Sequence, residues 1–156
     1  LCFFSVLLSK VIFASNMTID FVYNIDFKLD SESSIKSWIK EFCDHEGFRV
    51  DNLVFAFFSD DELKSLNIKY LSHDYYTDVI SFDDSHETNL KGNIAISVDR
   101  VRENAKNLIL PFEEELRRVM IHGVLHFMGY KDKTKEQIAN IRLKEEYALS
   151  MFHVKQ

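Results

Sequence analysis

Two histidines four residues apart, His122 and His126, lie in a run with the composition of a helix. Gly129 follows as a candidate helix stop, and the carboxylate of Asp132 comes three residues later. Two imidazoles and one carboxylate form a ligand set of open catalytic zinc sites, in which water takes the fourth position. This stretch therefore constrains both the local fold and the chemistry of the chain.

Helix geometry allows these histidines to share one ion. Positions four apart differ by about 40° around the axis and by about 6 Å along it, so both rings project from one face. We expect Gly123, a small residue beside a ligand, to leave room for an ion or substrate. Gly129 suits the left-handed residue that ends a helix and turns the chain, bringing Asp132 towards the same ion. The alternative is a pair of ordinary surface or core histidines.

A protease mechanism of the HExxH type is disfavoured. Such enzymes carry Glu directly after the first His as general base, and Gly123 occupies that position here. The sequence identifies no other general base.

The composition indicates one packed domain. The chain has 156 residues, of which 46% are hydrophobic and 14 are Phe. One Pro and four Gly leave no stretch resembling a linker between domains. Cys2 and Cys43 are too few and too far apart for a disulfide framework, which fits a reducing compartment.

Residues 1–16 differ from the rest because they are mostly apolar, with Lys10 in their middle. They are too short for a membrane span and lack the basic start of a signal peptide. We expect a non-native prefix from an upstream extension of the reading frame, with Met17 as the natural start and 17–156 as the domain. Export or a short membrane-associating segment is the alternative.

Hydrophobic periodicity predicts an α+β domain with a small mixed four-stranded sheet and about five helices. Asp99 is the expected N-cap of one helix, and a polar loop is expected at 83–92. Strands are expected at 19–25, 53–58, 79–82 and 93–98, and helices at 31–44, 60–71, 99–108, 111–128 and 135–151.

Three motifs resemble those of the YbeY endoribonuclease family of rRNA maturation factors. The run HGVLHFMGYKDK, which begins at His122, is similar to the family signature HGxLHLxGYDH. The second motif, residues 70–82, ends in TDVISF and resembles the family segment that ends in T-[ND]-V-L-S-F. The third, GNIAI from Gly92, resembles the family's G-D-I-x-I strand. The resemblance extends from about Met17 to the end of the chain.

The resemblance implies a zinc-hydrolase-like α+β fold, one Zn²⁺ per chain and hydrolysis of single-stranded RNA. It also implies maturation of the 3′ end of small-subunit (16S) ribosomal RNA and ribosome quality control in the cytoplasm. The implied partners are ribosomal RNA and the small ribosomal subunit. Carried over by position, the metal ligands are His122, His126 and Asp132.

The chain departs from the family pattern at three positions. Asp132 stands where His is commoner, which lowers the charge of a zinc site from +2 to +1. Leu71 follows Tyr70, the first residue of the second motif, at a position where many members have Arg, and Asn93 stands where Asp is common. The second departure leaves a phosphate-holding role vacant or supplied from elsewhere.

Charge is unevenly distributed along the chain, which has a net charge of −6. Residues 17–90 hold 6 basic and 16 acidic residues, whereas residues 91–135 hold 9 basic and 6 acidic ones. Tyr130, Lys131, Lys133 and His73 are therefore candidate RNA contacts near the motifs, and Tyr75 and Tyr76 are candidates for stacking on unpaired bases. For each of them, ordinary packing or solvated surface is the alternative.

Three functions remain open from the sequence. The first is a metal-dependent endoribonuclease acting on ribosomal RNA. The second is a non-catalytic ribosome-assembly factor stabilised by zinc, and the third is a zinc hydrolase of another substrate. Three protein ligands favour catalysis, because structural zinc sites are usually closed by four.

Overall fold

The structure is a computed structural model that describes residues 17–153. The expected prefix, residues 1–16, lies outside the described residues. Within the described range, no helix combines the length and apolar composition that crossing a membrane requires.

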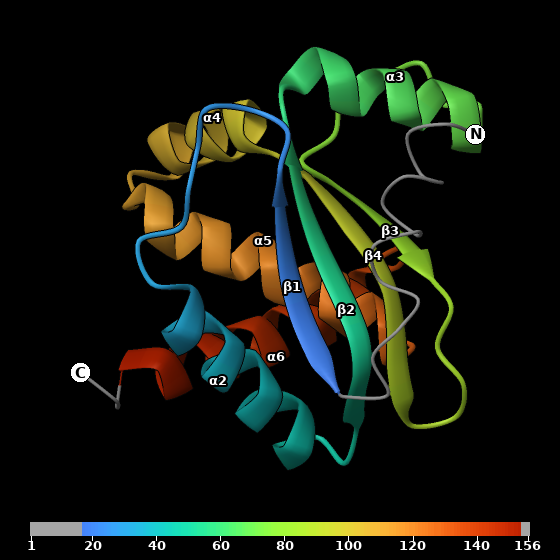
Figure 1. Cartoon of the computed structure of the whole chain (residues 1–156), viewed down its shortest axis with the longest axis vertical. Helices are drawn as coiled ribbons and strands as arrows, with labels where there is room; N and C mark the ends of the chain where they lie inside the picture. Colours follow the sequence, from blue (N-terminus) through green and yellow to red (C-terminus); the bar gives the residue numbers. More distant parts are fainter. Residues whose placement is uncertain (1–16, 154–156) are drawn as a thin grey trace.

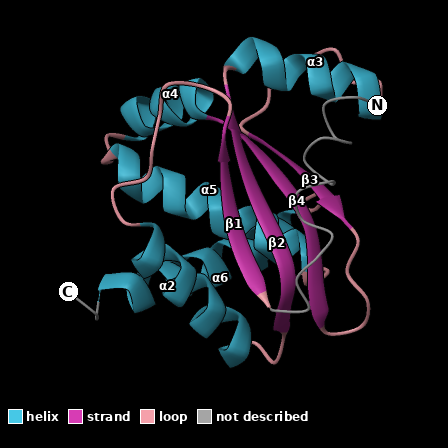
Figure 2. Ribbon diagram, viewed as in Figure 1, coloured by secondary structure: helices cyan, strands magenta, loops and turns pink. Residues whose placement is uncertain are grey.

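Four strands and five helices make up the described part of the chain (Figures 1 and 2). This confirms the predicted α+β architecture with a small sheet. The elements are β1 (Thr18–Tyr23), α2 (Glu32–His45), β2 (Arg49–Phe58), α3 (Asp60–Leu71), β3 (Val79–Asp83), β4 (Asn89–Ser97), α4 (Val98–Leu108), α5 (Phe112–Phe127) and α6 (Lys135–His153).

The sheet is mixed and has the strand order β1-β2-β4-β3. β1 and β4 pair with β2 in parallel, and β3 pairs with β4 in antiparallel. The predicted loop at 83–92 was wrong over its second half, because β4 already begins at Asn89. The polar residues at the start of β4 pair with β2, as Asn89 does with Arg49. This strand pairing outweighs the preference of polar residues for a loop.

The predicted cap of α4 was also wrong. Ser97 is the N-cap, and its hydroxyl accepts the backbone N–H of Arg100 at 3.1 Å. The Asp99 carboxylate instead accepts the backbone N–H of Asp60, at 3.0 Å, and so links the starts of α3 and α4.

The main core lies between one face of the sheet and helices α2, α4, α5 and α6 (Figure 1). Trp38, Phe42, Phe55 and Phe57 are among its fully buried side chains. A smaller apolar cluster, which includes Leu63, packs beneath α3. Burial raises the pKa of the Cys43 thiol to about 12, consistent with a packing role for this residue.

Gly123 allows α5 to lie unusually close to the sheet. A Cβ atom at this position would lie 2.8 Å from the Cγ2 of Ile94 in β4, which is fully buried. The expectation that Gly123 leaves room for an ion or substrate is therefore wrong, since Ile94 fills that space. The glycine serves the fold by bringing α5, with its histidines, against the sheet.

Candidate metal centre and substrate pocket

A Schellman turn ends α5 and sets the direction of the chain beyond it. Met128 is the C-cap, and Gly129 follows with a φ of +94°, a value that glycine adopts without steric cost. The N–H of Gly129 donates to the carbonyl of His126, and the N–H of Tyr130 donates to the carbonyl of Leu125, both at 3.0 Å. The predicted helix stop is confirmed.

This turn brings Asp132 back to the two histidines. The Nε2 atoms of His122 and His126 lie 3.0 Å apart, and Asp132 Oδ2 is 3.5 Å from each of them. His122 and His126 are partly buried, whereas the Asp132 side chain is 45% exposed. The three candidate ligands thus converge at the protein surface with one open side.

Hydrogen bonds on the far side of each ring orient both histidines. His122 Nδ1 lies 2.6 Å from Glu145 Oε1, and His126 Nδ1 lies 2.9 Å from the backbone carbonyl oxygen of Tyr130. Both partners accept hydrogen bonds, so each Nδ1 carries the proton and donates. The lone pairs of both Nε2 atoms are then directed towards Asp132, as ligands of one metal ion require.

The spacing of these atoms fits a small tetrahedral ion. Ligands about 2.1 Å from a tetrahedral zinc lie about 3.4 Å from one another. The observed separations of 3.0 and 3.5 Å bracket that value. His122, His126 and Asp132 are thus a group that could hold a metal ion, with one coordination position left open.

Glu145 is a candidate positioning residue that the sequence alone did not reveal. It lies on α6 with only 6% of its side chain exposed, and it also approaches Arg118, whose Nη1 is 3.5 Å from Oε1. Arg118 in turn donates to both carboxylate oxygens of the buried Glu115, at 2.6 and 2.7 Å. These hydrogen bonds raise the pKa of the Arg118 guanidinium above its usual value, which keeps it charged beside Glu145.

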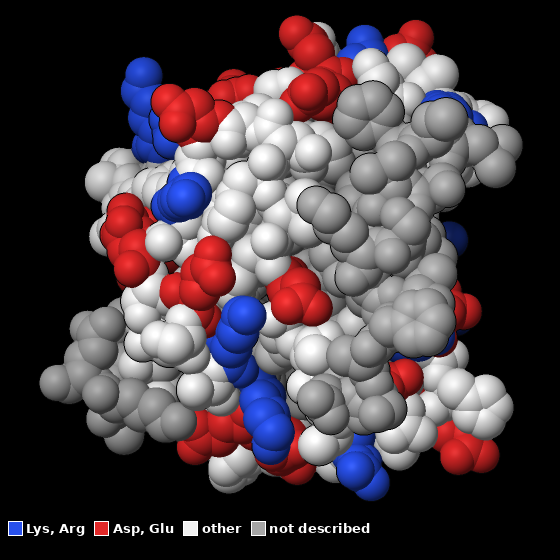
Figure 3. Space-filling view, in the orientation of Figure 1, with Lys and Arg blue, Asp and Glu red and all other residues white. Residues whose placement is uncertain are grey.

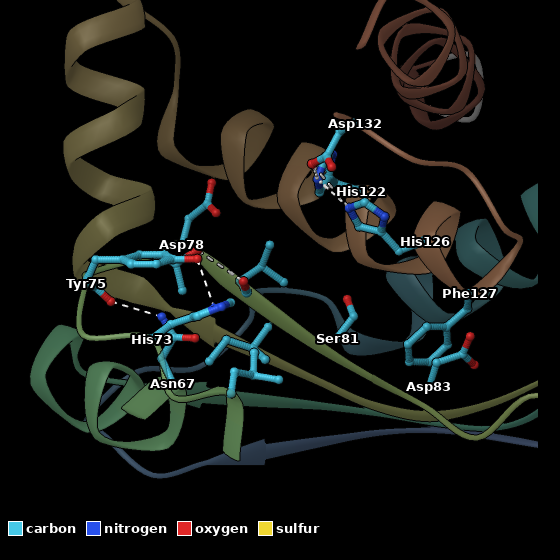
Figure 4. A pocket seen from close by; sticks show the side chains of 14 residues that line it. Asn67, His73, Tyr75, Asp78, Ser81, Asp83, His122, His126, Phe127 and Asp132 are labelled. Atoms are coloured by element: carbon cyan, nitrogen blue, oxygen red, sulfur yellow. Dashed lines mark hydrogen bonds and ion pairs between the residues drawn. The ribbon is translucent and has the colours of Figure 1, made fainter. Parts of the chain in front are cut away.

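A pocket of about 500 Å³ opens at the metal centre (Figure 4). One wall holds His122, His126 and Asp132, and the opposite wall comes from the segment that joins α3 to β3. The remaining lining residues are Asn67, Leu71, His73, Tyr75, Thr77, Asp78, Val79, Ile80, Ser81, Asp83 and Phe127.

Comparison with known proteins identifies the family. A model of the family described as Endoribonuclease YbeY matches residues 22–153. The chain belongs to the YbeY endoribonuclease family.

Individual relatives agree with this assignment. The chain is similar to Endoribonuclease YbeY of Flavobacterium psychrophilum, with 47% identity over 138 residues that cover 88% of this chain and 99% of the relative. It is 44% identical to Endoribonuclease YbeY of Christiangramia forsetii, again over 138 residues that cover 88% and 96% of the two chains. The solution structure of TM1509 from Thermotoga maritima has a similar fold, with a TM-score of 0.61, 26% identity and coverage of 88% and 91%.

Of two departures from the YbeY pattern, one lies in the pocket and the other does not. Leu71, at the position where many members have Arg, is 43% exposed and lines the pocket. Asn93 lies in β4, between Val54 of β2 and Phe82 of β3, and is not among the residues that line the pocket. The Leu71 departure therefore lies in the lining of the pocket at the candidate metal centre.

Of the four proposed RNA contacts, His73 lines the pocket. Tyr130 packs partly buried against the main core. It lies near Lys144, whose pKa is raised mainly by its hydrogen bonds and ion pair with Glu46 and to a smaller extent by Tyr130. Lys131 and Lys133 are exposed beside Asp132 and are not among the lining residues. The role of all four in binding RNA stays a prediction.

Proposed function

We propose that this chain is a metal-dependent endoribonuclease that hydrolyses a phosphodiester bond of single-stranded RNA. The observation that carries the proposal is the set of three convergent ligands, which opens on one side onto the 500 Å³ pocket. Membership of a family described as Endoribonuclease YbeY supports RNA as the substrate.

The donor set suits zinc, which prefers imidazole and carboxylate ligands in tetrahedral geometry. When bound, zinc supplies Lewis-acid polarisation of the phosphate and lowers the pKa of water. Glu145 and the Tyr130 carbonyl hold the His122 and His126 rings in place. Asp132, whose side chain is 45% exposed, would be the third ligand, and all three residues line the pocket from which a phosphate would approach.

We further propose that the substrate is the 3′ end of small-subunit ribosomal RNA. The protein would bind this RNA in the cytoplasm, on small subunits that are being assembled. The names of the relatives support an endoribonuclease, and the motif resemblance supports the ribosomal target. The ribosomal RNA and the small subunit are then the partners.

The alternative of a zinc-stabilised assembly factor without activity is less well supported. A structural zinc site is usually closed by four protein ligands, whereas this group has three and is partly exposed. The vacant arginine position at Leu71 is the feature that favours this alternative. A zinc hydrolase of another substrate lacks comparable support, because Gly123 replaces the Glu of zinc proteases.

The test is cleavage of single-stranded RNA and of RNA in isolated small subunits by metal-loaded protein. His122→Ala should abolish cleavage, whereas His45→Ala, which removes an exposed histidine on α2, should not. Equal cleavage by wild type and His122→Ala would reveal a contaminating nuclease. Binding to small subunits without cleavage, unchanged by His122→Ala, would establish the assembly factor instead.

A further inference from the structure

The wall of the pocket opposite the metal ligands carries a stacked pair of aromatic rings. The rings of His73 and Tyr75 have centroids 5.1 Å apart and planes 21° from parallel. A hydrogen bond of 3.0 Å joins the Tyr75 hydroxyl to His73 Nδ1. Both residues line the pocket, and Figure 4 shows them facing the cavity from the side opposite His122, His126 and Asp132.

The backbone beneath this pair is firmly anchored. Asn67, which is 1% exposed, donates from Nδ2 to the carbonyl of Tyr75 at 3.0 Å. Ser72 ends α3 in the left-handed conformation, and the N–H of His73 donates to the carbonyl of Asn67. The rings are therefore positioned before any ligand arrives, which lowers the entropic cost of binding.

The neighbouring Tyr76 serves the fold instead. Its ring lies beneath two cations, with Lys64 Nζ at 4.7 Å and Arg100 Cζ at 5.2 Å from the centroid. Its hydroxyl donates to Asp61 at 3.0 Å. Both tyrosines are exposed, Tyr75 to 55% and Tyr76 to 45%, but only Tyr75 is among the residues that line the pocket. The two adjacent tyrosines therefore have different roles.

The charge of the pocket indicates how RNA is held there. Three carboxylates, those of Asp78, Asp83 and Asp132, line it, and none of its described lining residues is Lys or Arg. Such a surface gains little from phosphate contacts, whereas an aromatic face gains from stacking on any base. Leu71, which is 43% exposed, adds apolar surface to the lining of the same pocket.

We infer that the His73–Tyr75 pair is a subsite for one unpaired nucleobase of the RNA whose phosphate lies at the metal centre. The inference rests on the proposed function and deepens it. Stacking on this pair positions the scissile bond. It also supplies binding energy in a pocket whose described lining residues include no Lys or Arg to contact phosphate.

The test combines variants of Tyr75 with an abasic scan of the substrate. A short single-stranded RNA with one cleavage site is prepared with an abasic nucleotide at each position in turn, and kcat and KM are measured with metal-loaded protein. In the wild type, one abasic position near the cleaved bond should raise KM about tenfold, the effect of losing one stacked base. Tyr75→Leu should raise KM for intact RNA by a similar factor, and the same abasic position should then have no further effect.

Two further variants separate stacking from general damage. Tyr75→Phe keeps the ring and loses the hydroxyl, so KM should stay within about twofold of the wild type. Tyr147→Leu removes an exposed tyrosine on α6 outside the pocket and should leave the abasic profile unchanged.

Each other outcome has a definite meaning. If the protein cleaves RNA but the penalties of Tyr75→Leu and of every abasic position simply multiply, the base subsite is wrong and the nuclease function stands. The same holds if Tyr75→Phe is as damaging as Tyr75→Leu. If the wild type neither binds nor cleaves the intact RNA, the proposed function fails, and the subsite fails with it.

Discussion

The two histidines of the metal centre are oriented by partners of different charge. Glu145 presents a carboxylate to His122, whereas Tyr130 presents a neutral backbone carbonyl to His126. A carboxylate raises the basicity of a metal-bound imidazole more than a carbonyl does. His122 is therefore the ligand whose affinity for metal depends most on a side chain that mutation can change.

Glu145→Gln should weaken zinc binding by about 10- to 100-fold, the usual cost of losing such a partner. The amide keeps the size of the side chain but removes the negative charge of the group that accepts the hydrogen bond from His122 Nδ1. Competition with a chromophoric chelator measures the affinity. The matched control is Glu146→Gln, an exposed neighbour on α6; equal losses in both variants would show that the contact with His122 is unimportant.

Asp132→His should lower the pH at which activity is half-maximal, by roughly one unit. The substitution restores the commoner family ligand and changes the charge of a zinc site from +1 to +2. The higher charge would lower the pKa of water at that site, so the water would lose its proton at a lower pH. A pH–rate profile with zinc content measured in parallel tests this. An unshifted midpoint with zinc still bound would contradict the electrostatic argument.

At the level of elements, the position of α5 against β4 determines where the ligands lie. Gly123 faces Ile94 on the sheet side of the helix, while His122 and His126 point to the pocket. The helix also carries the buried Glu115 and its partner Arg118, which contacts Glu145 on α6. Packing on one side of α5 thus fixes the geometry of the site on the other.

Gly123→Ala should destabilise the protein by about 1 kcal/mol or more. Overpacking a core costs about 1–3 kcal/mol, which exceeds the gain of at most about 1 kcal/mol from replacing a helical glycine by alanine. Urea unfolding measures the change. In an Ile94→Ala background the same substitution should cost less, because the clashing methyl is gone; an equal cost in both backgrounds would exclude the contact with Ile94 as the cause.

The sequence predicted the elements better than their limits and their contacts. The apolar stripe of α5 and the Gly129 stop were sufficient to predict that two candidate ligands share one helix face and that the turn brings Asp132 towards them. Glu145 could not be found in this way, since it lies 23 positions from His122 and only the packing of α6 on α5 brings them together. Its spacing, four residues after Ile141 and three before Ala148, which are both buried, was the signal that could have placed Glu145 on the inner face of α6. The role of Gly123 likewise depended on β4, which local periodicity does not reveal.

At the scale of the whole molecule, the distribution of charge does not by itself mark a surface for the proposed RNA substrate. The face drawn in Figure 3 shows acidic and basic side chains interspersed. The basic excess of residues 91–135 includes Lys131 and Lys133 beside the site, yet the pocket itself is lined by carboxylates. RNA binding should therefore depend only moderately on salt.

Leu71→Arg should make RNA binding depend more steeply on salt concentration. Each phosphate contact on a single strand adds about −0.7 to the slope of log K against log salt concentration. One new guanidinium at the rim of the pocket should change the slope by about that amount and tighten binding at low salt. Fluorescence anisotropy across a salt series measures it, with Leu143→Arg, an exposed leucine on α6 outside the pocket, as the control. Identical slopes in the two variants would mean that the pocket does not receive a phosphate.

The turn after α5 has a kinetic consequence. Tyr130 closes the helix with its N–H and orients His126 with its carbonyl oxygen, so one peptide segment performs both tasks. Fraying of the last turn of α5 would break both hydrogen bonds and free the imidazole. A metal ion held by these residues would then leave more readily when this turn opens, and amide exchange at Gly129 and Tyr130 should slow when zinc is added.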